Sequence, residues 1–152
     1  MANTFSQIYV HAVFAVRNRE SALAPEWRER LYDYIAAIVQ DRGNKMLAIG
    51  GTDNHVHIFF GMNPEETISS LMLAVKRDSS RWIRKEVLTD GNFHWQSGYG
   101  AFTYSKSQLP KVINYIQQQE KHHARKSFRE EYLEMLRKAE VKFDERYIFE
   151  DV

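Results

Sequence analysis

Strand-like and helix-like patterns of apolar residues follow one another along this chain. In residues 5–16, β-branched and aromatic residues on alternating faces predict a long, buried strand. Three further strands are expected at residues 46–49, 55–60 and 98–105. The turn-rich segment 50–54 is short enough to join the second and third of these strands as a hairpin.

The segments between and after these strands have helical spacing. One helix is expected to begin at Pro25 and to end before Gly43, which suits a left-handed closing position. A second helix is expected after Asn63 and Pro64, a third over about residues 108–125, and a charged C-terminal helix and tail over about 128–152. The order predicts an α+β fold: a ferredoxin-like β-α-β-β-α-β antiparallel sheet with helices on one face and additional C-terminal helices.

The third predicted strand carries the most informative motif. His55 and His57 alternate with Val56, Ile58 and Phe60. Because side chains two apart on a strand point to one face, both imidazoles face the same side, and the apolar residues form the opposite, buried face. Two such imidazoles can bind one metal ion, and the histidine face is expected to be the wetter one. The alternative is a pair of polar residues on a half-exposed strand.

Composition narrows the chemistry of such a site. With 152 residues, of which 43% are hydrophobic, the chain is expected to form a single domain, residues 1–152. There is no cysteine, so a metal would be held by His, Gln, Asp, Glu or water. The N-terminus has no signal-peptide pattern and no apolar run is long enough to span a membrane, so we expect a soluble, cytoplasmic protein.

A second group of polar side chains lies on the helix predicted after Pro110. Tyr115 and Gln119 are four residues apart and His122 continues the same stripe, so all three share one face. From the helix alone, such a tyrosine is more often a core or rim residue of an amphipathic helix than a nucleophile. Together with two histidines on a strand, however, a phenol is suited to metal-assisted attack on a phosphodiester, with a 3′-hydroxyl as leaving group.

These residues resemble those of a known family, the single-tyrosine HUH transposases of the IS200-like type, including the REP-associated tyrosine transposases. The motifs that carry the resemblance are His55-Val56-His57, residues 95–102 and residues 115–120. The resemblance implies a small homodimeric enzyme that cuts single-stranded DNA at hairpin-bearing element ends, forms a 5′-phosphotyrosine intermediate and rejoins strands with Mg²⁺ or Mn²⁺. In this family the tyrosine helix of one subunit can complete the site of the other.

Carried over to this chain, the resemblance implies that His55, His57 and Gln119 bind the metal and that Tyr115 is the nucleophile. The register of the third ligand stays open at this point. The alternatives to Gln119 are Gln118, His122 and His123.

Cations that could follow the DNA backbone lie in two places. One is the loop after the first strand, with Arg17 and Arg19. The other is the exposed face of the second helix, with Lys76, Arg77, Arg81 and Arg84. A basic helix face is equally common as a merely solvated face.

Two interpretations compete with an active transposase. A rolling-circle-type HUH nuclease would use the same motif, and a domesticated or inactive protein of the same fold would only bind single-stranded DNA or hairpins.

Asp53 is expected to be a turn residue and Trp95 a core residue. The stretch from residue 130 to 152 is expected to pack as a helix and tail without chemistry.

Overall fold

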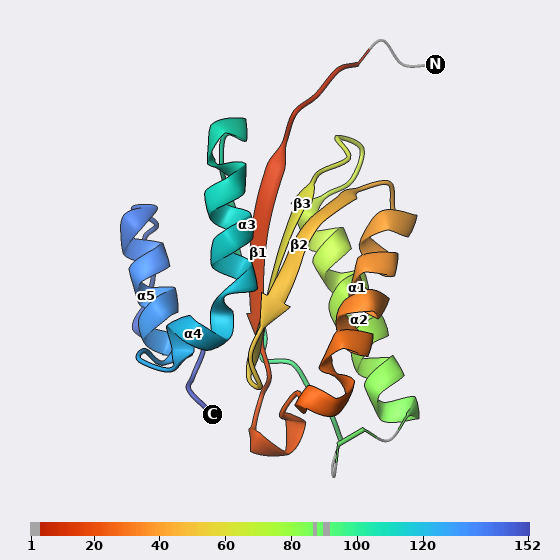
Figure 1. Cartoon of the computed structure of the whole chain (residues 1–152), viewed down its shortest axis with the longest axis vertical. Helices are drawn as coiled ribbons and strands as arrows, with labels where there is room; N and C mark the ends of the chain where they lie inside the picture. Colours follow the sequence, from red (N-terminus) through yellow and green to blue (C-terminus); the bar gives the residue numbers. More distant parts are fainter. Residues whose placement is uncertain (1–3, 87, 90–91) are drawn as a thin grey trace.

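A four-stranded antiparallel sheet forms the centre of the computed structural model, which describes residues 4–86, 88–89 and 92–152. The strand order across the sheet is β2-β3-β1-β4 (Figure 1). The strands are β1 (Tyr9–Ala15), β2 (Lys45–Gly51), β3 (His55–Gly61) and β4 (Gly100–Thr103). The predicted ferredoxin-like arrangement and the hairpin between β2 and β3 are confirmed.

Helices cover both faces of the sheet (Figure 1). On one face lie α1 (Pro25–Asp41) and α2 (Ile68–Lys85). On the other lie α3 (Leu109–Gln117), α4 (Gln119–His123) and α5 (Phe128–Lys138). Short 3-10 turns occur at Arg19–Ser21, Lys106–Gln108 and Glu145–Tyr147.

The alternation in β1 and β3 divides their side chains between two packing layers. Val56, Ile58 and Phe60 enter the large core beneath α1 and α2, as the sequence predicts. His55, His57 and Phe59 point to the opposite face, where Phe59 packs against α3. That face is not wet, because α3, α4 and α5 cover it and both histidines are 0% exposed. The expectation of a wetter histidine face, and its half-exposed alternative, are therefore wrong.

Several element boundaries differ from those expected. The second helix begins at Ile68 rather than near Pro64, because Thr67 supplies the N-cap and Asn63 instead closes a separate turn. The first and fourth strands are shorter than residues 5–16 and 98–105. The helix expected over about 108–125 is interrupted at Gln118, whose non-helical backbone separates α3 from α4.

Other expectations hold. Gly43 follows α1 with φ of 85°, the left-handed conformation that glycine adopts without strain. Trp95 is buried in the main core, where its indole N–H donates to Ser79 Oγ at 3.0 Å. Among the helices of the described residues, none has the length and apolar character needed to cross a membrane.

Candidate active site

His55 and His57 direct their Nε2 atoms toward one small volume between β3 and the helices above it. His55 Nε2 lies 2.8 Å from Gln119 Oε1, and His57 Nε2 lies 3.2 Å from Glu131 Oε1. Glu131 Oε1 is also 3.6 Å from His55 Nε2. Strand geometry therefore places two imidazole nitrogens on one face, and two separate helices bring oxygen atoms to them.

Glu131, on α5, is the centre of the hydrogen-bond network. The Tyr115 hydroxyl donates to Glu131 Oε2, and Gln119 Nε2 donates to the same oxygen at 3.1 Å. His123 Nε2 lies 3.1 Å from Glu131 Oε1. The stretch 130–152, which was expected to pack without chemistry, thus places one carboxylate inside this cluster.

A signal for Glu131 was present in the sequence. It occupies the buried stripe of α5, between the apolar residues Phe128, Tyr132 and Leu136. A carboxylate on the apolar face of an amphipathic helix is rarely buried without a partner. The partner could not be identified without knowing where α5 docks.

Burial and local charges set the protonation of these groups. Burial, together with the nearby His57, holds the pKa of His55 well below its ordinary value, so that imidazole is neutral and able to bind a metal. Burial also raises the pKa of the Tyr115 hydroxyl, and the charge of Glu131 raises it further. Burial alone would raise the pKa of Glu131, but hydrogen bonds from His123 and His57 outweigh it and lower that pKa.

Two glycines allow the helices to lie close to the sheet on this face. Gly50 pairs with His57 across β2 and β3, and a Cβ at Gly50 would overlap the carbonyl oxygen of Ile116 on α3. On β4, a Cβ at Gly100 would come within 2.6 Å of Tyr132 Cε1 on α5. The absence of these two side chains sets how closely the helices that carry Tyr115 and Glu131 approach β3.

His55 is held from the turn that precedes it. Its Nδ1 lies 2.7 Å from Asn54 Oδ1 and 3.1 Å from Thr52 Oγ1. On its other side, the ring of Phe128 stacks on the imidazole with centroids 4.1 Å apart. Asp53 makes no such contact and contributes its carbonyl to a backbone hydrogen bond from Leu23, in keeping with a turn role.

The candidates for a third ligand occupy different positions. Gln119 is 1% exposed and contacts His55, whereas Gln118 is half-buried and ends α3. His123 is half-buried and contacts the cluster through Glu131. His122 is exposed and contacts the Tyr115 ring at 4.8 Å between centroids.

The cations predicted to contact DNA do not gather at this site. Those of α2 lie on the opposite face of the sheet from Tyr115 (Figure 1). Lys76 Nζ donates to the carbonyls of Gln96 and Gly98, and Arg84 donates to that of Phe93, so both brace the segment before β4. The remaining predicted cations are exposed on the surface: Arg17, Arg19, Arg77 and Arg81.

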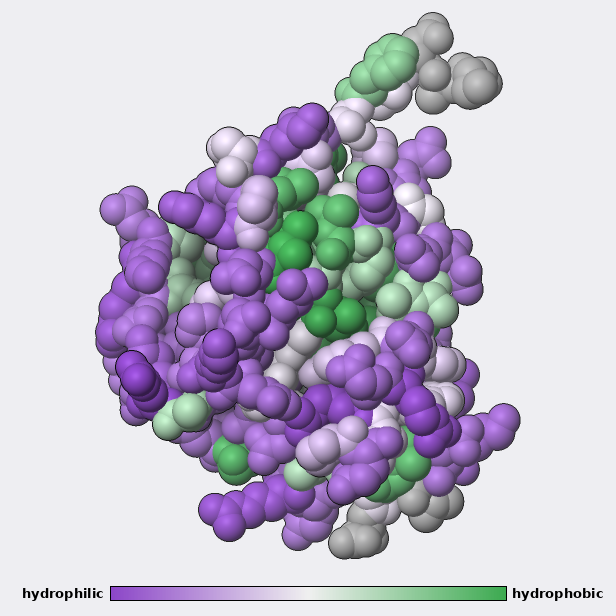
Figure 2. Space-filling view, in the orientation of Figure 1, coloured by the Kyte–Doolittle hydropathy of each residue, from purple (hydrophilic) through white to green (hydrophobic). Residues whose placement is uncertain are grey.

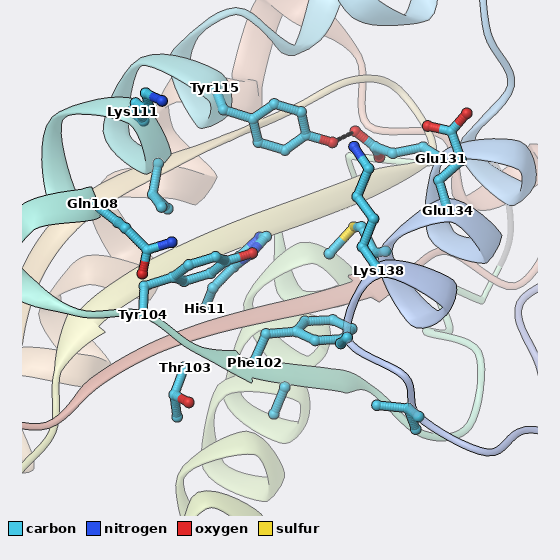
Figure 3. A pocket seen from close by; sticks show the side chains of 15 residues that line it. His11, Phe102, Thr103, Tyr104, Gln108, Lys111, Tyr115, Glu131, Glu134 and Lys138 are labelled. Atoms are coloured by element: carbon cyan, nitrogen blue, oxygen red, sulfur yellow. Dashed lines mark hydrogen bonds between the residues drawn. The ribbon is translucent and has the colours of Figure 1, made fainter.

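A cleft of about 750 Å³ opens beside Tyr115 between α3 and α5. Figure 3 shows Tyr115 and Glu131 joined at one end of it, with Tyr104 and His11 below. Lys111 comes from α3 and Lys138 from α5. The cleft joins the buried site to the surface and has a size typical of a small-molecule or nucleotide site.

The donor set suits a divalent cation. One ligand atom each from His55, His57 and Glu131 lie within 4.8 Å of one another, and all three residues are buried. Neutral imidazole nitrogen with carboxylate or amide oxygen is a donor set that first-row divalent ions accept. The residues therefore fit a metal-ion site with a phenol hydroxyl beside it.

Comparison with known proteins decides the family. The family model described as "Transposase IS200 like" matches residues 4–119, most of the chain. This chain belongs to the IS200-like transposase family. The predicted family and enzyme class are confirmed: such transposases are single-strand DNA endonucleases and strand transferases.

Individual relatives agree with this assignment. The ISDra2 transposase TnpA of Deinococcus radiodurans is 26% identical over 119 residues, covering 74% of this transposase and 84% of the relative. A candidate transposase from D. radiodurans R1 has a similar structure, with a TM-score of 0.62 at 22% identity over 78% of this chain and 95% of that chain. A REP-associated tyrosine transposase bound to a REP hairpin gives a TM-score of 0.58 at 16% identity, over 78% and 70% of the two chains. The two solved structures support the fold.

Proposed function

We propose that this transposase cuts and rejoins single-stranded DNA with Tyr115 as its nucleophile. The observation that carries the proposal is the convergence of the Tyr115 hydroxyl, the His55-His57 pair and Glu131 in one buried cluster. A new bond forms between Tyr115 Oη and phosphorus, and the bond from phosphorus to the 3′ oxygen breaks. The products are a 5′-phosphotyrosine and a free 3′-hydroxyl, and the reverse step can join a different strand end.

His55 and His57 would hold a divalent cation, Mg²⁺ or Mn²⁺, with Glu131 and Gln119 as the oxygen donors. When bound, the cation supplies positive charge that polarises the phosphoryl oxygen and favours the phenolate of Tyr115. Both oxygen donors contact an imidazole of the pair, so we propose that Glu131 adds to the ligand set that the family resemblance implies.

The chain's own groups define how Tyr115 is activated. Glu131 accepts the hydrogen bond from the Tyr115 hydroxyl and thereby orients it. The lowered pKa of Glu131 makes this carboxylate a poor proton acceptor, so the phenol proton leaves to solvent through the cleft before attack. The proton is returned when the phosphotyrosine bond is broken again.

The cleft beside Tyr115 suits an unpaired nucleotide of the substrate. Tyr104 offers a ring on which a base can stack, and Lys111 and Lys138 can reach phosphates. The solved relative bound to a REP hairpin supports the further proposal that hairpin-bearing DNA is recognised. The exposed cations Arg17, Arg19, Arg77 and Arg81 stay proposed phosphate contacts.

The assembly of the protein is also proposed. Figure 2 shows apolar side chains gathered over β2 and beside α3, and half-buried residues packed at this junction include Leu47, Leu109 and Ile113. An apolar surface beside an edge strand is a place where a second copy could pack, which supports a homodimer. We propose that the chain acts as a single domain in the cytoplasm, where its DNA substrate would be found.

The proposed reaction is tested by trapping its intermediate. Labelled single-stranded DNA from the flanks of the gene is incubated with Mn²⁺ or EDTA, and denaturing electrophoresis detects a protein-DNA adduct. We expect an adduct that needs Mn²⁺ and is absent in Tyr115→Phe. The matched control Tyr147→Phe, at an exposed tyrosine outside the cluster, should retain it.

Other outcomes would reassign the protein. An adduct that persists in Tyr115→Phe would contradict this choice of nucleophile. Binding of hairpin-bearing DNA without any adduct, and unaffected by EDTA, would indicate a domesticated binding protein.

A further inference from the structure

His11 lies beside His57 on the covered face of the sheet. β1 and β3 are adjacent antiparallel strands, and His11 is paired with Phe59, one step along the same face from His57. The His11 side chain is 1% exposed, and its ring stacks on that of His57 with centroids 5.0 Å apart. His11 Nε2 lies 2.7 Å from His57 Nδ1. Nothing in the sequence motif singled out this third histidine.

A hydrogen bond between two ring nitrogens needs one proton, so one of the two must be bare. The partner of His55 shows which arrangement the site uses. With a metal on His55 Nε2, the single ring proton must sit on Nδ1, which lies 2.7 Å from the amide oxygen Asn54 Oδ1 and can donate to it. His57 Nε2 faces the acceptor Glu131 Oε1 at 3.2 Å and can donate to it while no metal is bound. For this nitrogen to bind a metal instead, His57 Nδ1 must carry the proton and His11 Nε2 must be bare.

We propose that His11 is a positioning residue whose bare Nε2 accepts the Nδ1–H of His57 and thereby keeps His57 Nε2 available to the metal. The inference rests on the proposed metal centre. His11 serves His57 as Asn54 serves His55, so each ligand imidazole is oriented through its Nδ1 by a neighbouring acceptor. His11 itself is not among the residues whose ligand atoms converge, which are His55, His57 and Glu131.

The other nitrogen of His11 argues against a packing role alone. With Nε2 bare, Nδ1 carries the proton of a neutral ring, and this buried Nδ1 has no hydrogen-bond partner among the described residues. A buried donor without a partner is destabilising, so an apolar residue would fill this position at lower cost if only packing mattered. A histidine is useful here because its Nε2 is an acceptor.

The test compares an acceptor with an apolar side chain at position 11. Mn²⁺ affinity is measured by electron paramagnetic resonance of the free ion for the wild type, His11→Gln and His11→Leu, with circular dichroism to verify folding. We expect His11→Leu to lose roughly 10- to 100-fold in Mn²⁺ affinity. His11→Gln, whose amide oxygen can take the place of Nε2, should recover most of that loss, and His94→Leu, at an exposed histidine, should match the wild type.

A second measurement does not depend on variants. In ¹⁵N-histidine-labelled protein loaded with Zn²⁺ as a diamagnetic ion, long-range ¹H–¹⁵N correlations identify which ring nitrogens carry protons. We expect a proton on His57 Nδ1 and none on His11 Nε2.

The outcomes separate this inference from the proposed metal centre. Wild-type affinity in His11→Leu, an equal loss in His11→Gln and His11→Leu, or a proton on His11 Nε2 would overturn the role of His11 alone. A wild-type protein that takes up neither Mn²⁺ nor Zn²⁺ would overturn the metal centre and the role of His11 together.

Discussion

At the scale of single residues, the Glu131 carboxylate joins parts of the chain that are far apart in sequence. It contacts His57 from β3, Tyr115 from α3 and Gln119 from α4. A buried carboxylate without hydrogen-bond partners destabilises the fold. Removing the carboxylate likewise destabilises it, because the buried groups that contact it lose their partner. Its substitution should therefore affect metal binding and the nucleophile together.

Glu131→Gln preserves the shape of the side chain and removes its charge. We expect Mn²⁺ affinity to fall at least about tenfold, because an amide is a weaker ligand than a carboxylate. Titration calorimetry with MnCl₂ measures the change, and Glu134→Gln, at an exposed neighbour on the same helix, is the control. Unchanged affinity would leave Gln119 as the oxygen ligand and exclude Glu131.

The raised pKa of Tyr115 predicts the pH dependence of cleavage. Because this pKa lies above the ordinary value, the hydroxyl is protonated near neutrality and the reactive phenolate is a small fraction that grows with pH. Its abundance, and the single-turnover rate of adduct formation at saturating Mn²⁺, should rise about tenfold per pH unit between about pH 6.5 and 8.5. The lowered pKa of His55 keeps that ligand neutral in this range and does not oppose the rise. A rate independent of pH would show that chemistry at the phenol does not limit adduct formation.

At the scale of elements, the close docking of α3 on β2 is the feature that brings Tyr115 to the histidines. The rings of Tyr115 and His57 have centroids 5.8 Å apart. Packing of Val112 and Ile116 against Ala48 and Phe59 secures this contact. This close docking of α3 is possible because Gly50 has no Cβ, which would otherwise overlap the backbone of Ile116.

Gly50→Ala should disturb this docking. The added methyl group would overlap the backbone of Ile116, so α3 must shift away from the sheet. We expect a loss of about 1–3 kcal/mol in the free energy of unfolding, measured with urea, and a lower rate of adduct formation. Gly61→Ala is a matched control on β3, since its Cβ would meet Lys45 Cβ at an ordinary 3.6 Å. Equal stability of the two variants would contradict the proposed role of Gly50.

The same scale shows what could be predicted from the sequence. The two faces of β3 and the element order were predictable, because strand periodicity is a local property that burial of one face reinforces. The break at Gln118 was not, because no glycine or proline marks it. It occurs where Gln119 turns toward His55, which is a tertiary contact. Glu131 escaped prediction for the same reason, since its partners come from other elements.

At the scale of the whole molecule, one chain contains every group of the candidate site. Tyr115 on α3 lies against His57 of the same chain, and α5 joins both through Glu131. The sharing of a tyrosine helix between subunits, which the family resemblance allows, is not needed to complete this geometry.

Mixing two inactive variants tests this arrangement. Tyr115→Phe and His55→Ala are combined under conditions that allow subunits to exchange, and adducts are counted by denaturing electrophoresis. We expect no recovery, because each chain then lacks one essential group of its own site. Wild type mixed with Tyr115→Phe is the control and should retain adducts in proportion to its share. Recovered adducts would mean that α3 crosses to a partner.

The position of Glu131 beyond the family-matched residues 4–119 has a consequence for how such an enzyme can diversify. The sheet carries the imidazoles, and a peripheral helix carries the negative charge placed next to them. A single substitution at Glu131 on α5 can therefore change the charge beside the two imidazoles without changing any residue of the sheet.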